Sequence, residues 1–187
     1  MRLGLVALVA LAFVAGGCGG GTTTVTVTTT RTVTVAPPPS SSAASACGAA
    51  QLTGTFAGVP GSAGAGNIVY RLRLVNTGSS SCWVSGLPQV VLLDTSGGRL
   101  PTSVRPARPG IAAAKITLAP DGAATADARF SPDVPGVGDS QQPGQCEPTA
   151  STLRVTAPGG GAVDAPIKPP TPVCERGQLS FTLYTAA

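Results

Sequence analysis

The sequence predicts an all-β domain folded as an antiparallel β-sandwich, and three observations support this fold class. Large apolar side chains recur at every second position in Ile68, Tyr70, Leu72 and Leu74, a period that puts one face of a strand in a core and the other in water. Glycine and proline are abundant, at 25 and 18 of 187 residues, which favours short strands joined by turns. No stretch keeps a helical period long enough to compete.

The expected strands follow one another between clusters of turn residues. Gly, Pro, Ser, Asn and Asp gather at residues 76–78, 96–98, 120–122 and 159–161. Apolar runs between the breaks predict strands at residues 52–57, 68–75, 90–93, 116–118, 123–130, 153–157, 162–167 and 179–184. In the last of these, Leu179, Phe181 and Leu183 share a face. A total of about eight or nine short strands is typical of an immunoglobulin-like sandwich.

Residues 1–17 have the pattern of a signal peptide. Met1 and Arg2 form a short basic start, residues 3–14 are almost wholly apolar, and small residues lead to Cys18. The apolar run is shorter than the roughly 20 helical residues that span a bilayer. Small residues directly before a cysteine resemble a bacterial lipoprotein signal, whose cleavage leaves Cys18 as a lipid-modified first residue. We expect a lipid anchor at the extracytoplasmic face of the cell membrane, or a secreted protein if Cys18 is not lipidated.

Residues 18–46 are expected to be a tether. Thr and Val dominate up to residue 35, and a run of prolines and serines follows. Such low complexity, with few large apolar groups, cannot bury enough surface to fold alone. The 28 residues after Cys18 reach at most about 90 Å when extended. The folded domain is therefore predicted to occupy residues 47–187.

The charge and composition exclude several classes of function. The formal net charge is +4, but Arg2 and Arg31 precede the domain, which leaves ten basic against eight acidic residues, or +2. This charge is too small for a nucleic-acid-binding protein. The chain has no histidine, which rules out Ser-His-Asp, Cys-His and zinc-histidine chemistry. We expect no cofactor, no metal site and no enzymatic activity.

Four cysteines follow Cys18, an even number in a chain expected to leave the cytoplasm. They predict two disulfides, for which three connectivities are possible. We favour Cys47 with Cys82 and Cys146 with Cys174, because short closures form most readily. In the loop-entropy description each bridge stabilises the fold by about 3.5 to 4 kcal/mol.

A set of motifs runs through the whole domain in a fixed order. Cys47 is followed by LRLVNTGSSSCWVSGLPQVVLLDTSGGRL, then ITLAPDGAATADARF, then Cys146 with LRVTAP and Cys174 with GQLSFTLY. In this order the motifs resemble the domain of unknown function 4232 family, whose members are mostly actinobacterial lipoproteins. The resemblance implies a secreted or lipid-anchored β-sandwich with two disulfides, and it brings no activity and no site residues. Asp121 stands where the family often has glycine.

Two glutamates offer an alternative, enzymatic interpretation. Glu147 and Glu175 each directly follow a cysteine of the expected C-terminal disulfide, so their carboxylates could lie close together, as in glycoside hydrolases. Two solvated carboxylates beside a surface disulfide are the simpler interpretation. Trp83, next to Cys82, is expected to pack in the core, with an exposed ligand platform as the alternative.

One segment is distinctly basic. Arg99, Arg105, Arg108 and Lys115 lie in a Pro-rich stretch with no acidic residue between Thr95 and Pro120. A solvated loop is the simplest interpretation, but local clustering of charge also favours anionic partners. We expect a non-catalytic, membrane-tethered interaction module, with an anionic cell-wall polymer or an envelope protein as the partner. The alternative is an envelope glycan hydrolase using Glu147 and Glu175.

Overall fold

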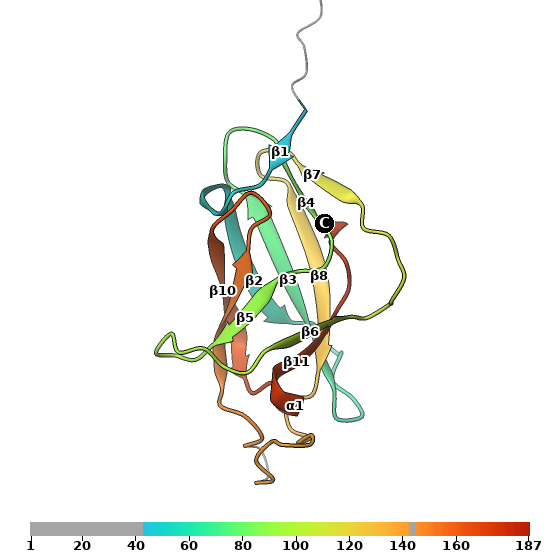
Figure 1. Cartoon of the computed structure of the whole chain (residues 1–187), viewed down its shortest axis with the longest axis vertical. Helices are drawn as coiled ribbons and strands as arrows, with labels where there is room; N and C mark the ends of the chain where they lie inside the picture. Colours follow the sequence, from blue (N-terminus) through green and yellow to red (C-terminus); the bar gives the residue numbers. More distant parts are fainter. Residues whose placement is uncertain (1–42, 143–144) are drawn as a thin grey trace, which may run out of the picture. The chain divides into compact units, whose positions relative to one another are not determined.

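The computed structural model describes residues 43–142 and 145–187, and Ser41–Ala187 form one compact unit with its own core (Figure 1). The expected signal peptide, Cys18 and nearly all of the expected tether lie outside the described residues. The strands are β1 (Ser45–Ala46), β2 (Leu52–Gly58), β3 (Ile68–Asn76), β4 (Cys82–Ser85), β5 (Val90–Leu93), β6 (Ser103–Pro106), β7 (Lys115–Leu118), β8 (Ala123–Phe130), β9 (Ala150–Thr156), β10 (Ala162–Thr171), β11 (Gln178–Phe181) and β12 (Thr185–Ala186). Two short helical turns are η1 (Ala49–Gln51) and α1 (Cys174–Gly177). The predicted all-β sandwich is confirmed.

The strands form one large and one small sheet. The main sheet has the order β5-β9-β10-β2-β3-β8-β11-β6, with β12 also paired to β8, and β1-β4-β7 form the small sheet. Most pairings are antiparallel, as predicted, but β1 with β4, β2 with β10 and β6 with β11 are parallel. The main sheet curls, so that β5 and β6 cross in front of its central strands in Figure 1.

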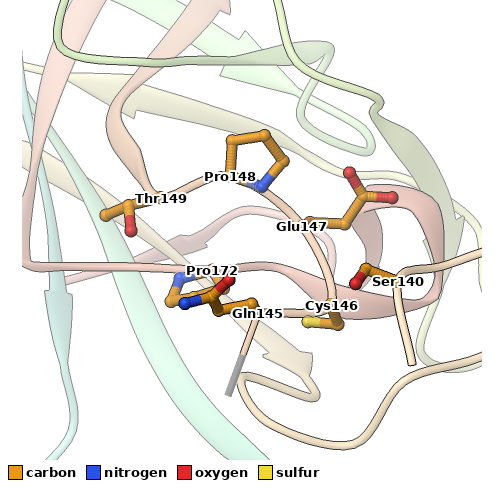
Figure 2. A pocket seen from close by; sticks show the side chains of 7 residues that line it. All are labelled: Ser140, Gln145, Cys146, Glu147, Pro148, Thr149 and Pro172. Carbon is orange, nitrogen blue, oxygen red and sulfur yellow. The ribbon is translucent and has the colours of Figure 1, made fainter. Parts of the chain in front are cut away.

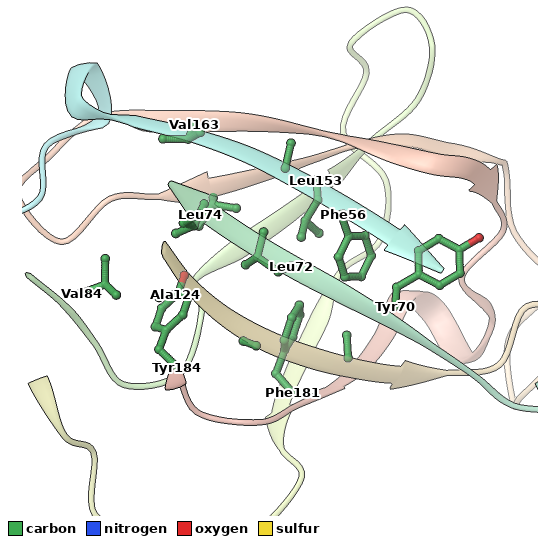
Figure 3. Close-up of a cluster of buried hydrophobic side chains, with 14 of the residues drawn as sticks. Phe56, Tyr70, Leu72, Leu74, Val84, Ala124, Leu153, Val163, Phe181 and Tyr184 are labelled. Atoms are coloured by element: carbon green, nitrogen blue, oxygen red, sulfur yellow. The ribbon is translucent and has the colours of Figure 1, made fainter. Parts of the chain in front are cut away.

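The core contains buried side chains from strands of both sheets, and on β3 these follow the predicted alternation. Tyr70, Leu72 and Leu74 of β3 are buried, whereas Arg71 and Arg73 between them are exposed. The neighbouring strand β8 contributes small buried alanines at positions 124, 126 and 128. These leave room for the larger rings, whose centroids lie 5.3 Å apart for Phe56 with Tyr70 and 6.1 Å apart for Phe56 with Phe181 (Figure 3).

A fully buried asparagine fixes the turn after β3. The Asn76 side-chain amide donates to the carbonyl oxygens of Ser80, at 2.9 Å, and Leu118, at 3.0 Å. Its Oδ1 accepts the N–H of Gly78 at 3.0 Å. The predicted turn at residues 76–78 is therefore tied to β7, and every polar atom of this buried amide side chain has a partner.

Both predicted disulfides are present. Cys47 is bonded to Cys82, with Cα atoms 4.8 Å apart, and this bridge joins the residue after β1 to the first residue of β4. Cys146 is bonded to Cys174, with Cα atoms 5.4 Å apart, and this bridge joins the segment before β9 to α1.

Several local features differ from the sequence predictions. The Pro-rich basic stretch contains an unpredicted strand, β6, which lies at one end of the main sheet. Residues 182–184 lie outside strands, because the ladder of β8 passes from β11 to β12 there. The turn predicted at residues 120–122 is present, and Asp121 in it adopts φ 62°, the left-handed region that glycine enters most easily.

The expectation that Trp83 packs in the core is wrong. Its ring is partly exposed, and Nζ of Lys115 lies 4.5 Å from the ring centroid. On β4 the buried positions are Cys82 and Val84, so the strand alternation turns Trp83 to the other face.

Candidate functional site

The C-terminal disulfide gathers a small group of charged residues. In α1, Glu175, Arg176 and Gly177 have φ values of 56°, 58° and 73°, so this turn is left-handed. Successive backbone N–H groups in such a turn point to one side and form a nest for an anion. The anion here is the carboxylate of Asp139, which accepts the N–H of Arg176 at 2.8 Å and the N–H of Glu175. Gly136 donates a third backbone N–H at 2.9 Å.

These contacts separate the pKa values of two neighbouring carboxyls. Burial raises the pKa of Asp139, but the backbone donors of Gly136, Glu175 and Arg176 outweigh this effect and hold it below its ordinary value. The pKa of Glu147 is raised by burial first, and then by the charge of Asp139 and a hydrogen bond with it. As the pH falls, Glu147 is therefore protonated before Asp139.

The pair differs from the one that the sequence suggested. The expected partner of Glu147 was Glu175, but the carboxyl group that acts on Glu147 is that of Asp139. The side chain of Glu175 instead accepts a hydrogen bond from Gln178. No spacing in the sequence paired Asp139 with Glu147 or with α1, because its partners in α1 lie 36 and 37 residues away.

An open pocket of about 500 Å³ adjoins this group (Figure 2). It is lined by Ser140, Gln145, Cys146, Glu147, Pro148, Thr149 and Pro172. Glu147 is the single carboxylate of this lining, and none of the seven residues is aromatic. The lining thus lacks the second carboxylate and the stacking platform that sugar hydrolysis uses.

The same region does not form a metal centre. A carboxylate oxygen of Asp139 and the Sγ atoms of Cys146 and Cys174 lie within 4.8 Å of one another. Both sulfurs are joined in the disulfide, so neither offers a thiolate to a cation. One carboxylate remains, and it is already engaged by three backbone N–H groups.

The four cations of the basic stretch lie on different elements. Arg99 follows the hairpin beyond β5, Arg105 lies in β6, Arg108 lies in the loop after it, and Lys115 begins β7. All four are exposed. The ion pairs of residues 43–142 and 145–187 are Arg71 with Asp127 and Arg154 with Asp164, so none of the four has a carboxylate partner there.

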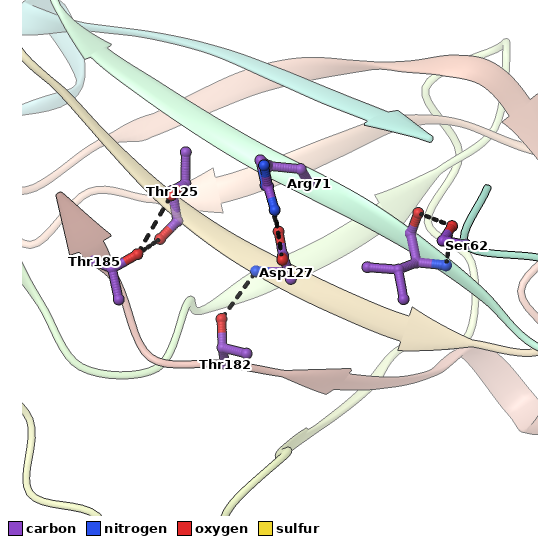
Figure 4. A network of polar contacts seen from close by, with 7 residues as sticks. Ser62, Arg71, Thr125, Asp127, Thr182 and Thr185 are labelled. Atoms are coloured by element: carbon purple, nitrogen blue, oxygen red, sulfur yellow. Dashed lines mark hydrogen bonds and ion pairs between the residues drawn. The ribbon is translucent and has the colours of Figure 1, made fainter. Parts of the chain in front are cut away.

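Further exposed cations lie on the outer face of the main sheet. Arg71 and Arg73 of β3, Arg129 of β8 and Lys168 of β10 point away from the core. Figure 4 shows the ion pair between Arg71 and Asp127 on this face. Nε and Nη2 of Arg71 lie 2.6 and 2.8 Å from the two carboxylate oxygens of Asp127. Strand alternation is the sequence signal that places these residues on the exposed face.

Comparison with known proteins gives one match. The model of the family described as "Domain of unknown function (DUF4232)" matches residues 47–185. Neither the curated proteins nor the solved structures contain a significant match. Within the described part of the chain, no helix has the length and apolar character needed to cross a bilayer.

Proposed function

The chain belongs to the DUF4232 family, and we propose that it is a lipid-anchored, extracytoplasmic binding module without catalytic activity. The observation that carries the proposal is the pair of disulfides in a domain that follows an apolar leader ending at Cys18. Structural disulfides persist in oxidising compartments, which supports a location outside the cytoplasm. The proposed lipid rests on the leader pattern before Cys18 and on the family resemblance, and the proposed actinobacterial cell envelope rests on the resemblance.

The charged group at the C-terminal disulfide supports a binding role over an enzymatic one. Catalysis by two carboxylates needs both groups free to reach a substrate. Asp139 instead closes a loop onto α1, and the pocket beside it offers Glu147 alone. The glycan hydrolase alternative with Glu147 and Glu175 therefore receives no support from this geometry. An anionic cell-wall polymer or an envelope protein remains the proposed partner.

The lipid anchor is tested by replacing Cys18. The Cys18→Ser variant should leave the membrane fraction and appear in the medium, or remain unprocessed, because serine cannot carry the thioether-linked lipid. The wild-type chain should stay with the membrane and be released by detergent. If the two proteins fractionate identically, the anchor is refuted.

A further inference from the structure

Four exposed cations form a row across the outer face of the main sheet, and we call this row the cation track. Its members are Arg105 of β6, Arg129 of β8, Arg71 of β3 and Lys168 of β10. Ser180 of β11 is opposite both Arg105 and Arg129, and Ala57 of β2 is opposite both Arg71 and Lys168. Residues directly opposite one another point to the same face of a sheet. All four cations are exposed, which agrees with this register.

The two halves of the track are adjacent. Arg129 is opposite Val69, and Arg71 is the next residue of β3 that points to the same face. Neighbouring strands lie about 4.8 Å apart, so the five strand intervals from β6 to β10 make the track about 24 Å long. Arg73 is the next residue of β3 after Arg71 that points to this face. It lies beside the track, between Thr55 of β2 and Thr125 of β8.

The track concentrates the positive charge of the domain. Together with Arg73 it holds five of the ten cations of the domain. Among the residues directly opposite Arg71 and Arg73, Asp127 is the one that carries a carboxylate. Asp127 pairs with Arg71, which leaves Arg105, Arg129, Lys168 and Arg73 without an ion pair among the residues that the structure describes. A local charge of about +4 on a domain of net +2 produces a positive potential where the average charge would not.

The shape and composition of this face favour a linear polymer over a membrane surface. Sheets twist by about 20 to 25° per strand, so the face turns by roughly 100° or more along the track and cannot lie flat on a bilayer. Membrane-surface proteins also insert large apolar side chains. The exposed large hydrophobics of the described residues are Ile111, Val134 and Val137, and all three lie outside the strands.

Hydroxyl groups and arginine forks point to phosphate as the anion. Arg105 and Arg129 flank the hydroxyl of Ser180, and Arg73 is flanked by two threonines. Guanidinium groups bind phosphate oxygens through two parallel hydrogen bonds, and hydroxyls supply further donors. We propose that the cation track binds a linear phosphate-bearing polymer of the cell envelope, which runs across the strands from β6 to β10. The proposal rests on the proposed function for the envelope location of the polymer.

The test compares two variants with the same net charge, using the oxidised Ser41–Ala187 unit. Arg129→Gln with Lys168→Gln removes two track cations, and Arg99→Gln with Arg108→Gln removes two exposed cations elsewhere. Binding to long-chain inorganic polyphosphate is measured by fluorescence anisotropy across a salt series. The track variant should bind about tenfold more weakly at low salt. Its salt slope should fall by about 1.4, since each phosphate contact to a flexible polyanion contributes about 0.7. The second variant should stay within about twofold of wild type.

Other outcomes overturn the proposal. Equal losses in both variants would mean that net charge alone drives binding, and a loss confined to the Arg99 and Arg108 variant would move the site to the basic stretch. Tighter binding to phosphatidylglycerol vesicles would assign the face to a membrane, and equal binding to poly-glutamate would remove the preference for phosphate. Absence of binding by the wild-type unit at low salt would also refute it. None of these results depends on Cys18, so the anchor and the track fail independently.

Discussion

The carboxylate of Asp139 accepts the backbone N–H of Arg176, 37 residues further along the chain, and so closes a loop onto the left-handed turn of α1. An acidic side chain occupies the nest that an external anion would otherwise fill. The same turn carries Cys174 of the second disulfide, so this corner is held by a covalent and an electrostatic link.

Replacing Asp139 should loosen this corner in a pH-dependent way. The amide introduced by Asp139→Asn offers one acceptor oxygen for three backbone donors, so the free energy of unfolding should fall by about 1 to 2 kcal/mol at pH 7. Because the pKa of Asp139 is lowered in the folded state, its stabilisation is present above the unfolded pKa of about 4 and is lost as pH falls through the folded pKa. Urea unfolding at pH 7 and pH 3 measures the difference between wild type and variant, which should shrink at the lower pH.

A matched control for this substitution lies in the same loop. Asp133 is exposed, so Asp133→Asn removes the same charge and should leave stability within about 0.5 kcal/mol of wild type. The pKa of Glu147, followed by NMR, should fall in Asp139→Asn because one cause of its upward shift is gone. A Glu147 titration unchanged by Asp139→Asn would show that the two carboxyls do not interact.

The buried amide of Asn76 should tolerate no charge. Asn76→Asp removes the donors to Ser80 and Leu118 and places a carboxylate against their carbonyl oxygens. We expect a loss of more than about 3 kcal/mol at pH 7, measured by urea unfolding. The pKa of the introduced carboxyl should be raised, so the loss should diminish as pH falls. Asn67→Asp is the control, because the side chain of Asn67 makes a single exposed hydrogen bond to Ala65.

Gly177 should be irreplaceable for two separable reasons. Its φ is +73°, and a Cβ atom there would overlap the carbonyl oxygen of Pro101. Gly97 has a similar φ of +82° but nothing within 4 Å of its Cβ position. Gly97→Ala should therefore cost about 1 kcal/mol from backbone strain alone, whereas Gly177→Ala should cost more than about 3 kcal/mol or prevent folding. Comparable thermal midpoints for the two variants would contradict this expectation, because they would show that the backbone near Pro101 can move to accommodate a Cβ atom at little cost.

The sequence predicted those parts of the molecule that depend on local pattern. The alternation from Ile68 to Leu74 located the central strand and its buried face, and β5 and β8 appeared at the predicted residues. The cysteine count and short closures predicted both disulfides. These features are set by neighbouring residues or by chemistry that has few alternatives.

The features that were missed depend on contacts between distant segments. The strand β6 exists because the backbone of β11 pairs with it, although its own sequence, rich in proline, argues against a strand. Asp139 meets α1 only after the loop has folded back, and no spacing rule anticipates a left-handed turn at two non-glycine residues. The cation track appears only when the register aligns residues from four strands.

The position of β6 at one end of the main sheet bears on self-association. An edge strand with free backbone N–H groups recruits further strands and seeds aggregation. Pro101 precedes β6 and Pro106 belongs to it, and neither has an N–H to donate. At the other end, the N–H of Leu100 donates to the carbonyl of Leu92 at 2.9 Å, so the hairpin beyond β5 folds over that edge. The two prolines and this hairpin thus reduce the number of free backbone N–H groups at the two ends of the sheet, which disfavours strand-to-strand association between molecules.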